Sequence, residues 1–394
     1  MANTLITPSI IAKEALLWFE NNMVFGGLVH RDYKKEFVKI GSKVSIRKPV
    51  KFVASDGATR VNQNVSESTT DITINKRKHV SWTFSMQDLT LTVAEYNKRY
   101  IQPACAALAN IVDSDLADLH SSFFMNVGTP GSAPSTFAVW LAAMQKADEQ
   151  LWPRQNRSIV LNPRAKTSLL DSLDANIFSE KLTEDAIMRG ACGKIVGMPI
   201  YEDANIKTFT PGTVVAGDTT IFATNPTTTT ITVTGSGGTH TWKVGDLFTI
   251  AGVYDINPMS RDAYRHLKQF VITEAVTESG GAATLTFYPA IITSGAYQTV
   301  SAAPEAGAAV VKPGTIYTDA QDRNMCFHKN AMALVMVPLE LPQGAAFKAR
   351  ETYKNLSIRV VKDYDIEEDE DIIRLDIMYG VKCIYPELSC LIFG

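Results

Sequence analysis

The middle of this chain changes composition sharply, and this change constrains the fold more than any other feature. Between about 208 and 319 the residues are mainly Thr, Gly and Ala. Short apolar runs at 230–234, 247–253, 268–276 and 283–288 are separated there by glycine-rich turns. Several short strands with turns between them are typical of a small all-β barrel. Because longer helix and strand patterns continue on both sides, the sequence predicts a barrel inserted into a larger host domain.

The chain before this insert begins with a predicted helix and an extended hairpin. Residues 10–25 are apolar almost all round, so a helix there must be buried. Alternating apolar residues predict one strand at 41–49 and a second at 72–84. The polar stretch 54–70 joins them, which predicts a hairpin that projects from the body.

After the predicted hairpin the spacing of the apolar residues changes from every second position to every third or fourth. From 89 to about 124 apolar residues recur every three or four positions, which predicts one long amphipathic helix that Pro103 kinks or divides. A helix at 136–151, a strand at 158–161 and a helix after Pro163 then predict an α/β arrangement.

Beyond the insert the chain returns to long alternating strands. These strands are predicted at 356–361 and 372–378, and the acidic run 363–371 links them as a turn. The run lacks the glycine that an EF-hand loop needs at its sixth position. It therefore leaves three interpretations open: a solvated turn, a weak cation site or a patch between subunits.

Charge divides this near-neutral chain into a basic beginning and an acidic remainder. The 394 residues carry a net charge of -3, but residues 1–80 hold 13 Lys and Arg against 7 Asp and Glu, a balance of +6. The remainder holds 25 against 34, a balance of -9. This asymmetry has two interpretations. The basic and acidic parts form complementary surfaces that steer one copy onto another, or they are only charged surface residues of a monomer, since exposed ion pairs are weak. The net charge disfavours a protein that coats nucleic acid.

The sequence carries no motif for a cofactor or a metal, and we predict neither. Its Gly193-Lys194 pair lacks the rest of a P-loop, and no H-E-x-x-H or G-x-S-x-G motif occurs. The five cysteines are scattered, which predicts buried free thiols. The six histidines are isolated in the sequence, which predicts surface or packed imidazoles rather than bases or ligands. A cytoplasmic hydrolase that uses acidic residues remains an alternative without a specific catalytic constellation.

Neither a membrane span nor a secretion signal is indicated. The longest apolar run, 331–339, is about half of the roughly 18 residues that a span needs. Residues 1–9 contain neither a basic nor an apolar region of a signal peptide, so we expect synthesis in a cytoplasm.

Five segments carry a family resemblance through their order and spacing. They lie at 20–49, 71–80, 190–202 and 374–387, with a fifth at 244–258 inside the predicted insert. In these segments the chain resembles the major capsid (coat) protein of tailed bacteriophages. The branch is that of short-tailed phages whose coat carries an inserted β domain on the HK-ninety-seven-type capsid fold.

The resemblance implies an α+β capsid fold built from six parts. These are an N-arm (1–30), an extended loop or β-hairpin region (31–85), the spine helix of a peripheral domain (86–128), an axial and peripheral α/β region (129–209), an inserted small all-β barrel domain (210–319) and the remainder of the axial and peripheral domains (320–394).

The resemblance also implies a function and its partners. The chain would self-assemble into hexamers and pentamers of an icosahedral phage head around double-stranded DNA, by way of a scaffolded precursor shell. Implied partners are other copies of the chain, a scaffolding protein and a portal protein; a decoration protein is left open, contact with packaged DNA is weak and non-specific, and no membrane is involved. The location would be the virion, after assembly in the host cytoplasm. A cellular encapsulating shell of the same fold is an alternative.

We expect a small set of side chains to take part in assembly. They are the aromatic and basic residues of the arm and hairpin and the acidic residues of the late turn: Trp18, Phe19, Phe25, Arg31, Lys43, Arg47, Lys48, Arg60, Asp365, Glu367, Glu368 and Asp369.

Overall fold

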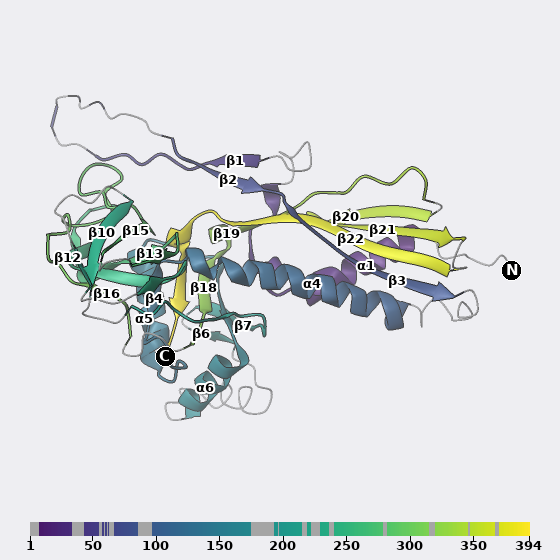
Figure 1. Cartoon of the computed structure of the whole chain (residues 1–394), viewed down its shortest axis with the longest axis horizontal. Helices are drawn as coiled ribbons and strands as arrows, with labels where there is room; N and C mark the ends of the chain where they lie inside the picture. The colour runs from purple at the N-terminus through teal and green to yellow at the C-terminus, as the bar shows by residue number, and fades with distance from the viewer. Residues whose placement is uncertain are drawn as a thin grey trace. The chain divides into compact units, whose positions relative to one another are not determined.

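Figure 1 shows the computed structural model of the chain, which consists of two compact units. The first unit contains residues 1–48, 69–117 and 332–384, and the second contains 49–68, 118–331 and 385–394. Both combine helices with sheets, which confirms the α+β class. The structure describes residues 8–33, 43–54, 57–58, 60, 62, 67–85, 97–174, 193–195, 197–214, 219–221, 229–235, 240–278, 282–314, 320–345, 347–366 and 370–394.

A five-stranded antiparallel sheet is the centre of the first unit. Its strands are β20 (Phe347–Tyr353), β21 (Leu356–Asp365), β22 (Glu370–Cys383), β3 (Lys76–Ser85) and β19 (Met332–Met336). β21 and β3 flank the first half of β22, β20 pairs with β21, and β19 pairs with the end of β22. The two alternating strands predicted around an acidic turn are therefore confirmed, and both are longer than predicted.

Two helices pack against this sheet and against each other. α1 (Pro8–Asn22) lies over β20 and β21, and α4 (Gln102–Ala117) lies over β22 and β3 (Figure 1). The prediction of a helix that must be buried is confirmed on the side of α1 that faces the sheet and α4. Phe19 is fully buried, whereas Leu17 is 54% exposed.

The predicted long helix is divided, as Pro103 suggested. A π-helical turn, η3 (Asn97–Ile101), precedes α4, and a 3-10 turn, η4 (Asp118–Ser122), follows it in sequence. Pro103 lies where the π-helical turn changes to the α-helix, and it has no N–H to donate to the preceding turn. The described chain is thus helical from 97 to 122, close to the predicted end at about 124, although in three segments. Residues 89–96 lie outside the described part of the chain.

The predicted hairpin is present, but its second strand is two strands. β1 (Lys43–Arg47) pairs antiparallel with β2 (Thr69–Thr73), and the chain then continues into β3, which pairs with β22 instead. A close approach to β22 marks this break, because a Cβ on Gly380 would lie 2.5 Å from the Thr73 carbonyl oxygen. Glycine at this position lets the hairpin lie against the sheet.

The second unit contains a mixed sheet with two helices. Its strand order is β4 (Met125–Val127), β23 (Ser389–Ile392), β18 (Asn324–His328), β5 (Arg157–Leu161), β7 (Met198–Glu202) and β6 (Lys194–Ile195). α5 (Phe137–Glu149) packs on β23 and β4, and α6 (Pro163–Asp174) packs on β5. These elements confirm the predicted α/β arrangement.

The Thr-rich and Gly-rich segment forms a second sheet in the same unit. Its strand order is β16 (Val310–Val311), β12 (Leu247–Ile256), β13 (Ala263–Ile272), β15 (Ala282–Tyr288), β10 (Thr230–Gly235) and β9 (Thr219–Ile221). The rings of Phe248, Phe270 and Phe287 pack together, with centroids 5.2 to 5.7 Å apart. The strand predicted at 268–276 is wrong in its bounds, because pairing with β12 begins at Ala263. Within the described residues β16 and β9 are not paired, so closure into a barrel stays a prediction.

Short elements complete the chain. They are α2 (Phe25–Leu28), β8 (Thr208–Phe209), β11 (Thr241–Trp242), β14 (Val276–Thr277), β17 (Gln321–Asp322), η5 (Lys329–Ala331) and η6 (Pro386–Leu388). Cys105, Cys326, Cys383 and Cys390 are free and buried, as predicted, and Cys192 lies outside the described residues. No helix in the described ranges is long and apolar enough to cross a membrane.

Candidate functional site: assembly surfaces

The predicted arm residues lie mostly inside the first unit. Phe19 and Phe25 are fully buried, which corrects their assignment as contact residues: they stabilise the arm within its own chain and offer no side-chain surface to a second copy. Trp18 and Arg31 are half-buried. Nη1 of Arg31 is enclosed and has no hydrogen-bond partner among the described residues.

A buried carboxylate that the sequence did not indicate holds the end of the arm. Asp113 of α4 is 2% exposed and accepts hydrogen bonds from the backbone N–H groups of Val24, at 2.6 Å, and Gly26, at 3.0 Å. These are N–H groups at the start of α2 that have no partner within that helix. Because almost 90 residues separate donors and acceptor, no local pattern could reveal this contact.

The hairpin presents a basic face. On β1 the side chains of Lys43 and Arg47 are exposed, while Val44 and Ile46 between them are buried. Ser45, also on the exposed side, donates a hydrogen bond to Asp71 of β2 at 2.6 Å. We call Lys43 and Arg47 the hairpin basic face. The strict alternation of charge and apolar residue, visible in the sequence, directs these charges away from the core.

The other two basic residues predicted for this region are placed differently. Lys48 follows β1 and is half-buried, and Arg60 is exposed in the second unit. Lys48 thus adjoins the hairpin basic face in the sequence, and Arg60 belongs to the other unit.

The outer side of the large sheet carries an arginine cluster. Asp376 of β22 is fully buried, and three arginines surround it: Arg359 at 2.6 Å, Arg374 at 2.8 Å and Arg77 at 3.6 Å. Burial alone would raise the pKa of Asp376, but the hydrogen bonds from Arg359 and Arg374 outweigh it and hold the pKa below its usual value. Three guanidinium groups against one carboxylate leave a surplus of positive charge.

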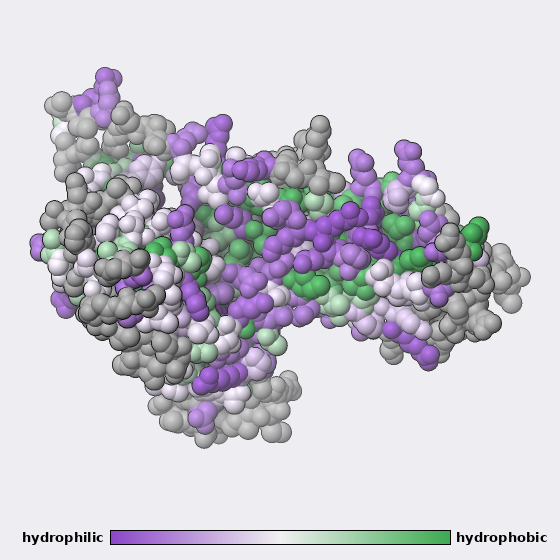
Figure 2. Space-filling view, in the orientation of Figure 1, coloured by the Kyte–Doolittle hydropathy of each residue, from purple (hydrophilic) through white to green (hydrophobic). Residues whose placement is uncertain are grey.

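The arginines of this cluster reach the surface. Arg77 is 50% exposed and Arg374 is 38% exposed, although Arg359 is largely covered. Figure 2 shows hydrophilic residues gathered in a band along the first unit. The alternation of β22 places residues 374 and 376 on one face, and this could be predicted from the sequence. The arginines on β3 and β21 could not, because they come close to Asp376 only through the pairing of these strands with β22.

The predicted acidic patch lies where β21 ends and β22 begins. Asp363 is exposed and Asp365 is half-buried, and Asp365 stands directly opposite Glu370 across the two strands. Like charges in this position disfavour the pairing, unless a cation or a basic neighbour compensates them. We call Asp363, Asp365 and Glu370 the acidic end; Glu367, Glu368 and Asp369 lie outside the described residues. Among the described residues, no group of three His, Cys, Asp or Glu side chains could hold a metal ion.

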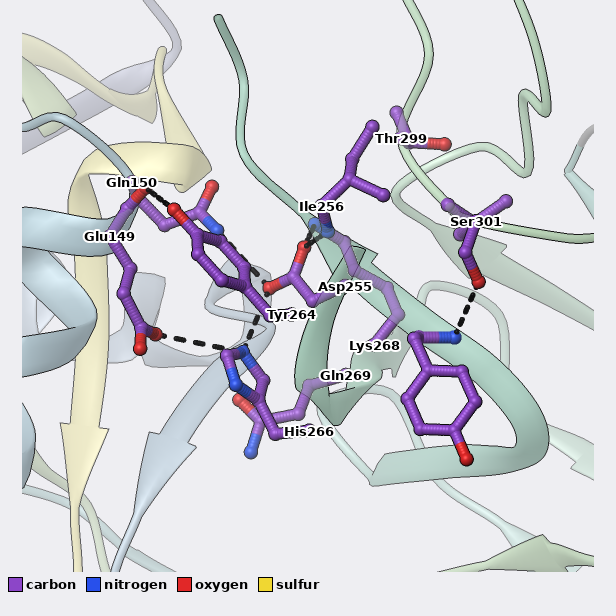
Figure 3. A network of polar contacts seen from close by, with 12 residues as sticks. Glu149, Gln150, Asp255, Ile256, Tyr264, His266, Lys268, Gln269, Thr299 and Ser301 are labelled. Atoms are coloured by element: carbon purple, nitrogen blue, oxygen red, sulfur yellow. Dashed lines mark hydrogen bonds and ion pairs between the residues drawn. The ribbon is translucent and has the colours of Figure 1, made fainter. Parts of the chain in front are cut away.

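The second unit contains a buried polar network of a different kind, between the insert and α5 (Figure 3). Asp255 of β12 pairs with Lys268 of β13 at 2.8 Å and accepts a hydrogen bond from Gln150 at 3.1 Å. Tyr264 of β13 donates to the backbone oxygen of Glu149 at 2.9 Å. These contacts fasten the insert to the end of α5.

His266 lies at the centre of this network. Its Nε2 is 3.5 Å from Asp255 and 3.6 Å from Glu149, so this residue is a packed imidazole, one of the two states predicted for the histidines. Burial raises the pKa of Asp255, but His266 and the charge of Lys268 outweigh it and lower the pKa to about 2. All members of the network are engaged with one another, as expected of a structural junction.

Comparison with known proteins identifies the kind of chain. A family model described as "P22 coat protein - gene protein 5" matches residues 1–394. A search of curated proteins gives no match.

Solved phage capsids are similar at low identity. The "Capsid of Ralstonia phage GP4" is 10% identical, with a TM-score of 0.49 over 100% of this chain and 93% of that one. A structure of "Mycobacterium phage Che8" is 15% identical, with a TM-score of 0.48 over 94% and 90% of the two chains. The family match across the whole length, rather than these likenesses, carries the assignment.

Proposed function

The chain belongs to the P22 coat protein family, and on that premise we propose which of its surfaces join the copies. It is a major capsid protein, whose copies form the icosahedral shell of a phage head in the virion. It is a structural protein and not an enzyme.

The finer account of assembly belongs to this proposal. The chain forms hexamers and pentamers of the head, first in a precursor shell with a scaffolding protein and later around double-stranded DNA, with a portal protein at one vertex. The net charge of -3 supports only weak, non-specific contact with the packaged DNA. We keep Trp18, Arg31, Lys48 and Arg60 as further contact candidates, because each is at least partly exposed.

The contact between copies pairs the hairpin basic face of one chain with the acidic end of the next. The observation that carries it is the alternation of β1, which points Lys43 and Arg47 outward while Val44 and Ile46 are buried. Asp363 of the acidic end is likewise exposed. Opposite charges on exposed faces steer association and fix its register more than they supply affinity.

Sizing of the expressed chain, alone and with its scaffolding protein, tests the shell. We expect particles of many copies. Only monodisperse chains of 43.2 kDa, under every condition tried, would contradict it.

Charge reversal tests the contact. The double variant Lys43→Glu/Arg47→Glu should slow assembly, followed by light scattering at low salt, by about tenfold or more, because steering is lost. Adding Asp363→Lys and Asp365→Lys should restore the rate. The matched control is Arg154→Glu, since Arg154 is an exposed arginine of the second unit. Equal rates for the double variant and this control would overturn the proposed contact while leaving the shell itself intact.

A further inference from the structure

A small cavity lies in the second unit where the two ends of the insert meet the body. Asp246, Lys312, Gln321 and Arg323 line it together with Pro211 and Pro313, and its volume is about 10 Å³. Residue 211 precedes the strands of the insert, 312 follows the last of them, and 321 and 323 belong to the returning chain. A space of this size holds one species about as large as a water molecule.

Arg323 reaches this cavity with donors that have no partner. Its side chain is 1% exposed, and its Nη2 donates to the backbone oxygen of Gly245 at 3.2 Å. Nε and Nη1 are enclosed without a hydrogen-bond partner among the residues that the structure describes. The guanidinium carbon lies 4.2 Å from the ring centroid of Phe209, a contact that favours the cation but accepts no N–H in the plane of the group. A buried charged donor without an acceptor is strongly unfavourable.

The carboxylate of Asp246, which also lines the cavity, already accepts hydrogen bonds from donors other than Arg323. Asp246 accepts from Nζ of Lys312 at 2.9 Å and from the backbone N–H groups of Gly212 and Lys243, at 3.1 and 3.0 Å. Lys312 donates a second hydrogen bond to the Gly212 oxygen at 3.0 Å, which leaves one of its three protons unassigned. Two buried cations against one carboxylate leave a formal charge of +1 around the cavity.

The protein therefore replaces only part of the water that these two cations lose on folding. Burial lowers the pKa of Lys312, although Asp246 opposes the effect. Burial also lowers the pKa of Arg323, to about 9, against a smaller opposing effect of Asp246. At neutral pH the guanidinium thus stays charged, and its positive charge is only partly balanced.

We propose that this cavity binds one monatomic anion, a halide such as chloride, between Arg323 and Lys312. The surplus charge and the unpartnered N–H groups of Arg323 favour an anion over a neutral water molecule. The small size of the cavity favours a monatomic ion over phosphate, sulfate and carboxylate ligands. By binding where Asp246, Lys312 and Arg323 meet, the anion stabilises the attachment of the insert to the body.

Thermal unfolding of the full, unassembled chain tests this site. At constant ionic strength, replacing gluconate by chloride or bromide should raise the transition midpoint in a saturable way, by roughly 2–4 °C at about ten times the Kd. The Arg323→Met variant should lose this dependence, and Arg154→Met, a change at an exposed arginine, should keep it. Equal midpoints in gluconate and in chloride, or an unchanged halide dependence in Arg323→Met, would overturn the site.

A second measurement needs no variant, so it holds even if Arg323→Met does not fold. Crystals of the wild-type chain grown in bromide should give an anomalous scattering peak within hydrogen-bond distance of Nε or Nη1 of Arg323. An ordered water only, with no anomalous signal in the cavity, would overturn the proposal.

Discussion

The two units of this coat protein use charged side chains in opposite ways. In the second unit both members of each principal ion pair are buried: Lys268 and Asp255 are 6% and 3% exposed, and Lys312 and Asp246 are 4% and 1% exposed. In the first unit the carboxylate of Asp376 is buried, whereas the side chains of Arg77 and Arg374 beside it extend to the surface. The two ion pairs of the second unit therefore lie in its interior, whereas Arg77 and Arg374 place charge at the surface of the first unit.

The largest expected effect comes from breaking a buried pair in the second unit. Lys268→Met leaves the carboxylate of Asp255 buried without its principal cation, which should lower the free energy of unfolding by about 3–5 kcal/mol. The midpoint of urea unfolding of the unassembled chain measures it. Lys354→Met is the matched control, because Lys354 is 54% exposed and its pair with Glu20 lies near the surface, so the midpoint should change little. Equal midpoints for the two variants would refute the distinction between buried and displayed charge.

A steric change at the base of the hairpin should come next. Gly380→Ala places a Cβ against the backbone of Thr73, where neither strand can move freely, and should cost about 3 kcal/mol. Gly344→Ala is the control in the same unit, since a Cβ there meets nothing within 4 Å. The same urea experiment separates them. If both variants unfold at the same urea concentration, the hairpin does not depend on this close approach.

Acid should weaken the second unit through Asp255. Its pKa is about 2 in the folded chain and about 4 in the unfolded chain, so its contribution is fully present above pH 4 and is lost as the pH falls toward 2. The expected loss is about 2 kcal/mol. Comparison of wild type with Asp255→Asn across this range isolates the effect, because the variant lacks the titrating group. Parallel pH profiles of the two proteins would contradict it.

The smallest effect is expected at the displayed cluster of the first unit. Asp376→Asn removes the charge that the three arginines share, and should cost about 1–2 kcal/mol because water reaches Arg77 and Arg374. The loss should shrink at high salt, in contrast to that of Lys268→Met. A larger loss than that of Lys268→Met would reverse the comparison of the two units.

Much of the fold could be predicted from local patterns. The alternation of apolar and polar residues identified β1, β21 and β22. The recurrence of apolar residues every three or four positions identified α4, and the change of composition to Thr and Gly identified the inserted sheet. The errors lie where a tertiary contact decided the outcome. β2 and β3 separate because each pairs with a different strand, and Phe19 is buried because the sheet and α4 cover it.

The site was less predictable because its members come together only on folding. Lys43 and Arg47 could be predicted as exposed residues, because the charges and the alternation with apolar residues lie within one strand. Asp113, Asp376 and Arg323 were missed, because each acts through partners that lie far away in the sequence. A buried charged residue can be predicted only when its partners are known, and the periodicity of the sequence does not identify these partners.

A reconstruction of the assembled shell at side-chain resolution tests the central claim most directly. The account predicts that Lys43 or Arg47 of one copy lies within about 4 Å of Asp363 or Asp365 of a neighbouring copy. Shells in which the hairpin basic face and the acidic end both point to solvent, or contact other surfaces, would contradict it.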